Sequence, residues 1–267
     1  EGITYIGRYA FAQCSNLTGD LTIPNSVNTI EDYAFGECSG FNGSLTIPSN
    51  VTSIGDWAFI ECSGFTEVYS CAETAPTLGT KAFTGTNSNA ILYYPVSSEQ
   101  SYNEKGWFNY FPQHIGFNGR CGDNLYWRVN DNILTIFGTG AMYDYGSDNN
   151  KAPWRSLNPA PTSLVLDEDI THIGNYAFYG CSSFTGSLTI PNSVTTIGNN
   201  AFQECSGFTG SLTIPNSVTS IGEGAFYNCT KFNGSLTIGN SVTTIENAAF
   251  YGCDGFTEVH SSAVIAP

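Results

Sequence analysis

Cysteine is the residue type whose number and spacing first suggest chemistry in this sequence. The chain has nine cysteines, enough for a disulfide framework or a metal site. A structural zinc site needs close pairs such as Cys-x₂-Cys, and the sequence contains none. Seven of the cysteines instead occupy one equivalent position, three residues after a phenylalanine: Cys14, Cys38, Cys62, Cys181, Cys205, Cys229 and Cys253.

The regular spacing favours free thiols over disulfides. If equivalent segments stack, their Cα atoms lie about 5 Å apart, as in neighbouring strands. That distance permits a disulfide, but parallel Cα–Cβ vectors do not favour one. We therefore predict a ladder of buried free thiols. Cys71 and Cys121 lie off the ladder, and a bridge between these two is an alternative that the sequence leaves open.

The other reactive residue types show no catalytic arrangement. His114, His172 and His260 have no serine, cysteine or carboxylate at a spacing typical of catalytic sites. No phosphate-binding Gly-x₄-Gly-Lys motif is present. The acidic stretches 144–148 and 167–169 lack the glycine and final glutamate of a calcium loop. We expect surface or cap histidines, solvated acidic turns, no metal, no cofactor and no enzyme activity.

Charge and composition exclude several classes of partner. Eight basic residues against 23 acidic residues give a net charge of −15, which disfavours nucleic acid because phosphates are bound by clustered lysine and arginine. No long apolar run is present, so we expect no membrane insertion by this segment. No signal peptide is found either. Charged residues make up only 12%, and the abundant serine, threonine, asparagine and glycine suit short strands and turns.

An internal repeat organises almost the whole chain. An Ala-Phe pair recurs every 24 residues in each of two arrays. The pairs begin at Ala10, Ala34, Ala58 and Ala82, and again at Ala177, Ala201, Ala225 and Ala249.

The full repeat, Ser211–Gly234, predicts a strand followed by two turns. Leu212 and Ile214 alternate with Thr213, which is typical of a strand. A Pro-Asn-Ser sequence then turns the chain into a second leg. Ala225, Phe226 and Cys229 fit one short helical or 3₁₀ turn. A single repeat cannot bury these apolar residues, whereas stacked repeats can. The predicted fold is therefore a repeat solenoid.

A longer period divides the chain into two domains. Residues 1–76 align without a gap to residues 192–267, since Phe11 matches Phe202 and Cys62 matches Cys253. This offset suggests a duplicated module and a chain that is a piece of something longer. Residues 90–164 break the period. They predict a helical lid, with a capping box at Ser97 and Gln100, and a β-hairpin lid around 130–132. We expect domains at 1–118 and 119–267.

The motif Leu-x-Ile-Pro-x-Ser-Val-x₂-Ile-x₃-Ala-Phe-x₂-Cys resembles the BspA-like leucine-rich repeats of bacterial surface proteins. The segments that begin at Ile91 and Cys121 look like the flanking segments of those repeats. The family usually repeats at 23 residues, whereas this chain repeats mostly at 24, and a bulge beside Gly210 and its equivalents is one explanation. The resemblance implies a horseshoe of strands and short helical turns, location at the cell surface or secretion, and adhesion to host proteins or other cells. It implies no catalytic residues.

The outward positions of the first strand are the candidate binding residues. In a leucine-rich repeat this strand lines the concave face. Threonine here simply suits strands, whereas the two tyrosines would add an aromatic patch suited to interfaces. The candidates are Thr22, Thr46, Tyr69 and Tyr93 in the first array, and Thr189, Thr213, Thr237 and His260 in the second.

Two functions follow from these observations. The first is a non-catalytic surface module that binds an extracellular protein or glycan. The alternative is a structural spacer within a larger surface protein, because near-identical repeats need no ligand to explain them. An exposed Tyr69–Tyr93 patch would favour binding, and a uniform serine and threonine face would favour the spacer. An enzyme would require a pocket with converging titratable groups, which the sequence does not indicate.

Overall fold

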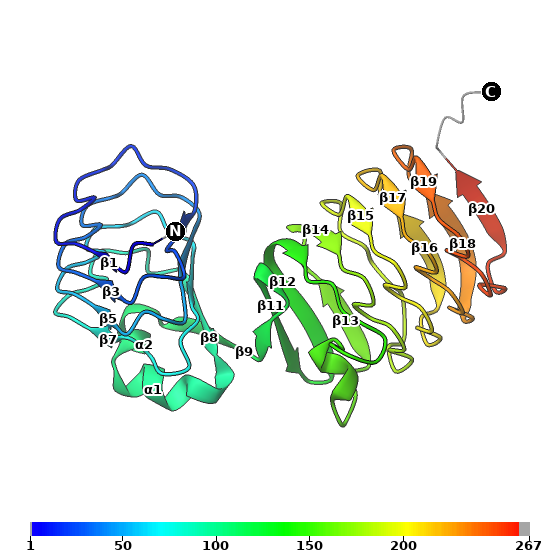
Figure 1. The fold of residues 1–267 in the computed structure, drawn as a ribbon, viewed down its shortest axis with the longest axis horizontal. Helices are drawn as coiled ribbons and strands as arrows, with labels where there is room; N and C mark the ends of the chain where they lie inside the picture. The colour runs from blue at the N-terminus through cyan, green and yellow to red at the C-terminus, as the bar shows by residue number, and fades with distance from the viewer. Residues whose placement is uncertain (1, 262–267) are drawn as a thin grey trace. The chain divides into compact units, whose positions relative to one another are not determined.

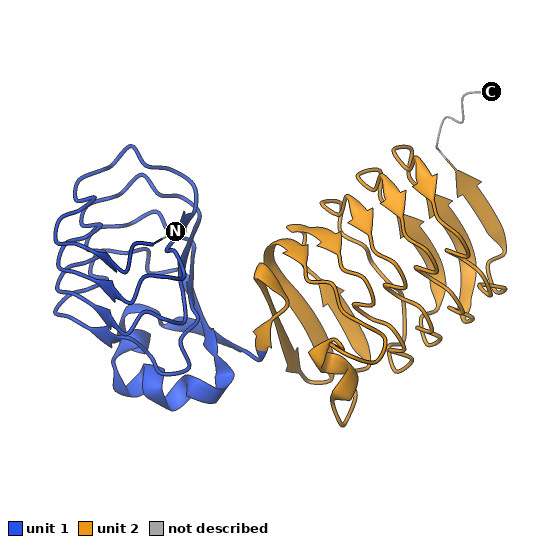
Figure 2. Ribbon diagram, viewed as in Figure 1, with its two compact units in different colours: residues 1–118 blue, residues 119–267 orange. Residues whose placement is uncertain are grey.

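The computed structural model describes residues 2–261. The chain divides into two compact units, unit 1 at Glu1–Asn118 and unit 2 at Gly119–Pro267 (Figure 2). Each unit is a solenoid of short strands joined by turns (Figure 1). No helix in the described part of the chain is long and apolar enough to cross a membrane.

Unit 1 consists of two parallel sheets, because both legs of each repeat form strands. The first leg, expected as a strand, builds a sheet in the order β2 (Leu21–Thr22), β4 (Ser44–Ile47), β6 (Glu67–Ser70), β8 (Ile91–Pro95) and β9 (Gln113–Phe117). The second leg also forms strands, in the order β1 (Tyr5–Ile6), β3 (Thr29–Ile30), β5 (Ser53–Ile54) and β7 (Thr77–Leu78).

Three short helical segments follow β8 in unit 1: η1 (Val96–Ser98), α1 (Glu99–Glu104) and α2 (Trp107–Tyr110). The expected capping box is wrong. Ser98, not Ser97, precedes α1, and it makes no side-chain capping bond. The Ser97 hydroxyl instead donates to Glu73 at 2.8 Å, and Gln100 bonds to Glu104. We call one repeat of the solenoid a coil. A tertiary contact with the preceding coil therefore replaces the local capping interaction.

Unit 2 begins with a β-hairpin that continues into a solenoid. The hairpin strands are β11 (Gly122–Asn130) and β12 (Ile133–Met142), preceded by β10 (Gly119–Arg120). Asp131 and Asn132 between them both have positive φ, 48° and 63°, as a two-residue hairpin turn requires. The predicted hairpin is confirmed. Strand β12 then pairs in parallel with β13 (Ser163–Leu166) and β14 (Ile170–Ile173).

The repeats of unit 2 form the same two kinds of strand. The second legs extend β14 through β15 (Thr196–Ile197), β17 (Ser220–Ile221) and β19 (Thr244–Ile245). The first legs form a sheet of β16 (Gly210–Ile214), β18 (Phe232–Ile238) and β20 (Glu258–Ser261). The register shifts between Gly210 and Leu212, and Gly210 has a φ of 82°. The expected irregularity therefore lies at this glycine.

Stacked phenylalanine rings form the centre of each core. In unit 2 the rings of Phe178, Phe202 and Phe226 are buried, with neighbouring centroids 5.1 and 5.2 Å apart. The ring of Trp154, from η2 (Pro153–Ser156), stacks on Phe178 at 5.5 Å. In unit 1 the last ring of the equivalent ladder, Phe83, packs against Trp107, Tyr110 and Phe111. Such stacks are worth about 0.5–1.5 kcal/mol per pair beyond burial.

The turn that carries the Ala-Phe pair is not the helical turn that the spacing suggested. Tyr33 and Glu37 have positive φ, 54° and 60°, which a helix does not allow. The N–H groups of Ala34 and Gly36 bond back three residues, whereas those of Phe35 and Glu37 donate to Ala58 and Ile60 of the next coil. The left-handed residues turn alternate N–H groups outward, so the turn bonds to its neighbour instead of to itself.

Side-chain carbonyl and carboxylate oxygens extend this bonding between coils. Asp32 accepts the backbone N–H of Asp56 at 2.9 Å, and Asp56 accepts that of Thr80 at 2.6 Å. In unit 2, Asn199 accepts the N–H of Glu223 at 2.9 Å. We name this row of side chains the Asx ladder. Asparagine and aspartate perform the same task in it because each offers an acceptor oxygen at the same distance from the backbone.

The Asx ladder yields a stability prediction. Substitution Asn199→Ala removes the acceptor of the Glu223 N–H, and we expect it to lower the free energy of unfolding by about 1 kcal/mol. Asn199→Asp keeps an acceptor there, as Asp32 and Asp56 do in unit 1, so we expect a markedly smaller loss. Urea denaturation of both variants measures the difference. Equal losses would mean that the hydrogen bond contributes nothing.

Candidate recognition surfaces

The outward face of the β16–β18–β20 sheet carries three of the predicted site residues in register. Thr213 pairs with Thr237, which pairs with His260. Thr213 and His260 are exposed and Thr237 is partly exposed, while their neighbours Leu212 and Leu236 face the core. The His260 imidazole lies 3.0 Å from the Glu258 carboxylate. Thr189 is also exposed, although it lies outside the named strands. This sheet therefore presents a polar row to solvent.

The corresponding row in unit 1 is mostly buried. Thr22 is exposed, but Thr46, Tyr69 and Tyr93 retain only 8%, 4% and 9% of their surface. The two tyrosine rings stack at 4.6 Å, and both hydroxyls donate to the carboxylate of Glu67, at 2.9 and 3.2 Å. The structure thus brings the two tyrosines together, as their spacing predicted, with little exposed ring surface.

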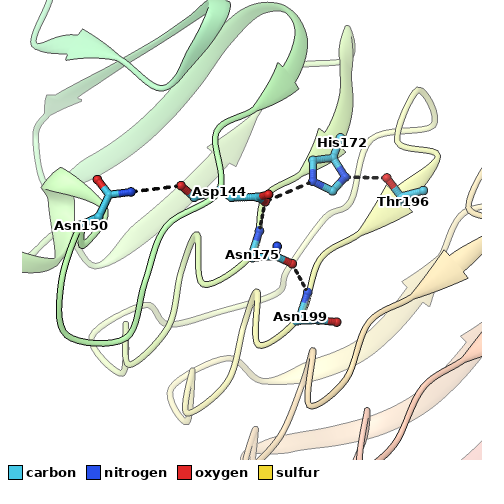
Figure 3. Close-up of polar contacts among 6 residues, drawn as sticks. All are labelled: Asp144, Asn150, His172, Asn175, Thr196 and Asn199. Carbon is cyan, nitrogen blue, oxygen red and sulfur yellow. Dashed lines mark hydrogen bonds and ion pairs between the residues drawn. The ribbon is translucent and has the colours of Figure 1, made fainter.

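His172 has close partners that its sequence neighbourhood does not reveal. Its Nδ1 lies 2.5 Å from the Thr196 hydroxyl, and its Nε2 lies 3.7 Å from the Asp144 carboxylate (Figure 3). The sequence predicts a surface or cap histidine, and His172 is partly exposed. Strand pairing places Thr196 beside it, and the segment after β12 supplies Asp144. Hydroxyl, imidazole and carboxylate are the groups of nucleophilic sites.

The hydrogen bonds around Asp144 indicate that His172, Thr196 and Asp144 have a structural role. The carboxylate of Asp144 also accepts the backbone N–H of Asn175 at 2.8 Å, and Asn175 accepts that of Asn199 at 2.6 Å (Figure 3). Asp144 therefore begins the Asx ladder of unit 2, and Asn150 bonds to its backbone. The contact of His172 with Asp144 and Thr196 joins the segment after the hairpin to the first two coils.

A row of stacked aromatic rings on the turns of unit 1 was not identified from the sequence. Tyr9, Tyr33 and Trp57 each precede an Ala-Phe pair, with ring centroids 4.9 and 5.1 Å apart. Tyr9 is 51% exposed, and the other two are partly exposed. Their spacing of 24 residues was the available signal, but only the structure shows that this position faces solvent.

The predicted ladder of free thiols is confirmed, because all nine cysteines are free. Five thiols of the ladder, those of Cys38, Cys62, Cys205, Cys229 and Cys253, donate to the carbonyl of a phenylalanine in the preceding coil. The Cys62 and Cys205 thiols do so to Phe35 and Phe178, each at 3.0 Å. Burial raises the pKa of Cys62 from 9.0 to about 12, and likewise the pKa of Cys181 to about 12. The thiols therefore act as apolar core groups with a hydrogen-bond donor.

These pKa shifts predict a loss of stability in alkali. A thiol whose pKa is higher in the folded state stabilises the fold fully below its unfolded pKa, and this contribution is lost as the pH rises toward the folded value. We expect the free energy of unfolding to fall between pH 9.0 and about pH 12. Urea titrations at several pH values measure the slope. The Cys62→Ser, Cys181→Ser variant should show a shallower slope, and an unchanged slope would contradict the assignment.

Comparisons with known proteins agree on the type of repeat. The model of the BspA type leucine rich repeat region matches residues 1–108 and 158–265, in six copies. No curated protein matches the chain.

Three solved structures resemble the chain. A leucine rich cell surface protein from Faecalibacterium prausnitzii is 22% identical over 98% of this chain and 70% of its own, with a TM-score of 0.40. A leucine-rich repeat protein from Eubacterium ventriosum is 27% identical over 55% of this chain and 43% of its own, with a TM-score of 0.43. A third, from Bacteroides ovatus, is 21% identical over 98% of this chain and 60% of its own, with a TM-score of 0.38.

The chain thus spans between 43% and 70% of the lengths of these three proteins. The family assignment rests on the repeat motif, on the stacked coils and on the family model, which covers most of the sequence. The chain belongs to the family of BspA-type leucine-rich repeat proteins.

Proposed function

We propose that the chain is a non-catalytic recognition module, located at the cell surface or secreted, that binds an extracellular protein or glycan. Membership of the BspA-type repeat family supports this function. One similar solved structure is named a leucine rich cell surface protein. Repeat solenoids bind partners through extended faces rather than through enclosed pockets, which agrees with the long, shallow sheets of both units.

The proposed binding face is the outward side of the first-leg strands. The observation that carries it is the exposed polar row Thr213, Thr237 and His260, held in register on β16, β18 and β20. A rigid sheet presents such a row without an ordering cost, which favours binding. The proposed face also includes Thr189 in unit 2 and Thr22 in unit 1, which are both exposed. Thr46, Tyr69 and Tyr93 lie in the same row, but they are buried, so they support the face and add little contact surface to it.

A binding assay with two pairs of lysine substitutions tests this function. The purified chain is applied to arrays of extracellular-matrix proteins and mucosal glycans. The Thr213→Lys, Thr237→Lys variant places two long charged side chains on the proposed face. We expect it to weaken binding at least about tenfold, which corresponds to 1.4 kcal/mol. The control, Thr230→Lys with Ser241→Lys, adds the same charge at exposed positions in turns, and it should bind like the unmodified chain.

The outcomes separate the candidate functions. Binding that both variants retain would place the site away from β16–β18–β20. A second assay with Tyr69→Phe, Tyr93→Phe, which keeps both rings but removes the bonds to Glu67, then tests the row in unit 1. If the chain binds nothing on the arrays, the recognition function is contradicted and the alternative, a structural spacer, is favoured.

A further inference from the structure

The aromatic row Tyr9–Tyr33–Trp57 of unit 1 has no counterpart in unit 2. The alignment that matches Phe11 to Phe202 matches these three residues to Asn200, Gly224 and Ala248. Both sets precede an Ala-Phe pair in a coil of the same length. The two sets therefore differ in their side chains but share the same backbone conformation.

The shared backbone disfavours the aromatic residues. The φ angles of Tyr9, Tyr33 and Trp57 are 59°, 54° and 54°, and those of their counterparts in unit 2 are 54°, 58° and 54°. Glycine and asparagine suit this left-handed conformation, whereas a bulky side chain is disfavoured there. At this position unit 2 has asparagine, glycine and alanine in three coils and a single ring, Tyr176, in its first repeat, so the fold does not require a row of rings there. We therefore infer that the partly exposed aromatic row has a role at the surface.

Tyr9, the first ring of the row, shows which kind of group the row can bind. The guanidinium of Arg8 lies over the Tyr9 ring, 5.1 Å from its centroid. Its Nε lies 3.9 Å from the carboxylate of Asp32, in the next coil. A cation is thus held between an aromatic face and a carboxylate one coil further on, an arrangement in which both groups attract it.

The second coil repeats the ring and the carboxylate but not the cation. Tyr33 is related to Asp56 as Tyr9 is to Asp32, since each carboxylate comes 23 residues after its ring. The position of Arg8 is taken in this coil by Asp32 itself. One oxygen of Asp56 accepts the N–H of Thr80, and the other has no hydrogen-bond or ion-pair partner within residues 2–261. The Trp57 ring stacks on Tyr33 and completes the aromatic surface.

Charge and shape favour a basic ligand at this position. The chain has a net charge of −15, and the same turns expose Glu37 and Glu61. An acidic surface attracts cations and repels anionic glycans. An open groove of about 340 Å³ is lined by Asp32 and Gly55, which are next in sequence to Tyr33 and Asp56, while the three rings are not part of its lining. Arg8 and the hydroxyl-bearing residues Thr29, Ser53 and Thr77 also line it. These hydroxyls can bond to the backbone of an extended peptide.

We propose that Tyr33, Trp57 and Asp56 bind the guanidinium or ammonium groups of a basic peptide segment on an extracellular partner. The ring faces supply cation–π attraction, the carboxylate supplies an ion pair, and the groove beside them receives the peptide backbone. This inference gives a chemical class to one ligand of the proposed recognition module, and it rests on that function. The site is separate from the β16–β18–β20 face, which belongs to unit 2.

A charge-neutral variant tests the proposal. The probe is a fluorescein-labelled hexa-arginine peptide, titrated by fluorescence polarisation at about 0.15 M salt. The Tyr9→Asn, Tyr33→Gly, Trp57→Ala variant carries the residues that unit 2 has at these positions, so we expect it to fold. It leaves the net charge unchanged, and non-specific attraction to the acidic chain therefore stays the same. We expect its Kd for the peptide to be at least about tenfold higher, a loss of 1.4 kcal/mol.

Tryptophan fluorescence gives a local readout. Trp107, Trp127 and Trp154 are 0%, 7% and 1% exposed, whereas Trp57 is partly exposed. Acrylamide quenching of the native chain should therefore report mainly on Trp57, and bound peptide should reduce it. Unchanged quenching at saturating peptide would mean that the peptide lies elsewhere, which overturns the proposal.

Matched control variants separate loss of the Tyr33–Trp57–Asp56 site from changes in overall charge or aromatic content. Asp56→Asn keeps the acceptor for Thr80 but removes the charge, and we expect several-fold weaker binding. Glu168→Gln removes one charge at an exposed position in unit 2 and should change little. Tyr227→Ala with Tyr251→Ala removes the stacked tyrosine pair of unit 2, whose centroids are 5.0 Å apart, and should bind normally.

The outcomes distinguish this proposal from the proposed function. Equal affinity of the unmodified chain and the triple variant would show attraction by net charge alone and overturn the aromatic site. No binding of the peptide by the unmodified chain would overturn it as well. In either case, binding to the matrix and glycan arrays that depends on Thr213 and Thr237 would leave the recognition function standing.

Discussion

Each coil of this protein depends on the next coil for its backbone hydrogen bonds. Strands of two residues cannot satisfy their own polar groups, and the turns direct alternate N–H groups outward to the neighbouring coil. A buried polar group without a partner costs a large part of the stability of a domain. Coils of nearly equal length that stack in register meet this requirement. This explains why paired second-leg strands are 24 residues apart and the first-leg strands of successive repeats are 23 or 24 residues apart.

The side chains at most repeat positions follow from the same requirement. The Asx ladder satisfies N–H groups between coils, the thiols donate to carbonyls such as that of Phe35, and the phenylalanine rings fill the space between the sheets. None of these contacts requires an ion pair, which agrees with the small share of charged residues, 12%. Some repeat positions carry side chains that make none of these contacts. The residues there can differ between repeats without loss of stability, so surface recognition can vary at these positions.

The comparison of the two units separates structure from recognition. The position before the Ala-Phe pair has the same left-handed backbone in both units. It carries three consecutive rings and then Lys81 in unit 1, whereas in unit 2 it carries one ring, Tyr176, followed by asparagine, glycine and alanine. At the outward strand position, threonine recurs in both units, as the strand conformation favours. The aromatic row is therefore more informative about a ligand than the threonine row, because the backbone accounts for threonine but not for exposed rings in a left-handed turn.

The sequence by itself determined the period, the first-leg strands, the core positions of Phe202 and its equivalents, the free thiols and the hairpin at 131–132. These features are local patterns that recur, and repetition makes weak local signals strong. Only the tertiary structure decided the partners of His172, the burial of Tyr69 and Tyr93, and the conformation of the turn at Tyr33. Each of these depends on contacts with residues about one coil away. Such contacts set which side chain faces solvent and which N–H turns outward, and no window of neighbouring residues contains that information.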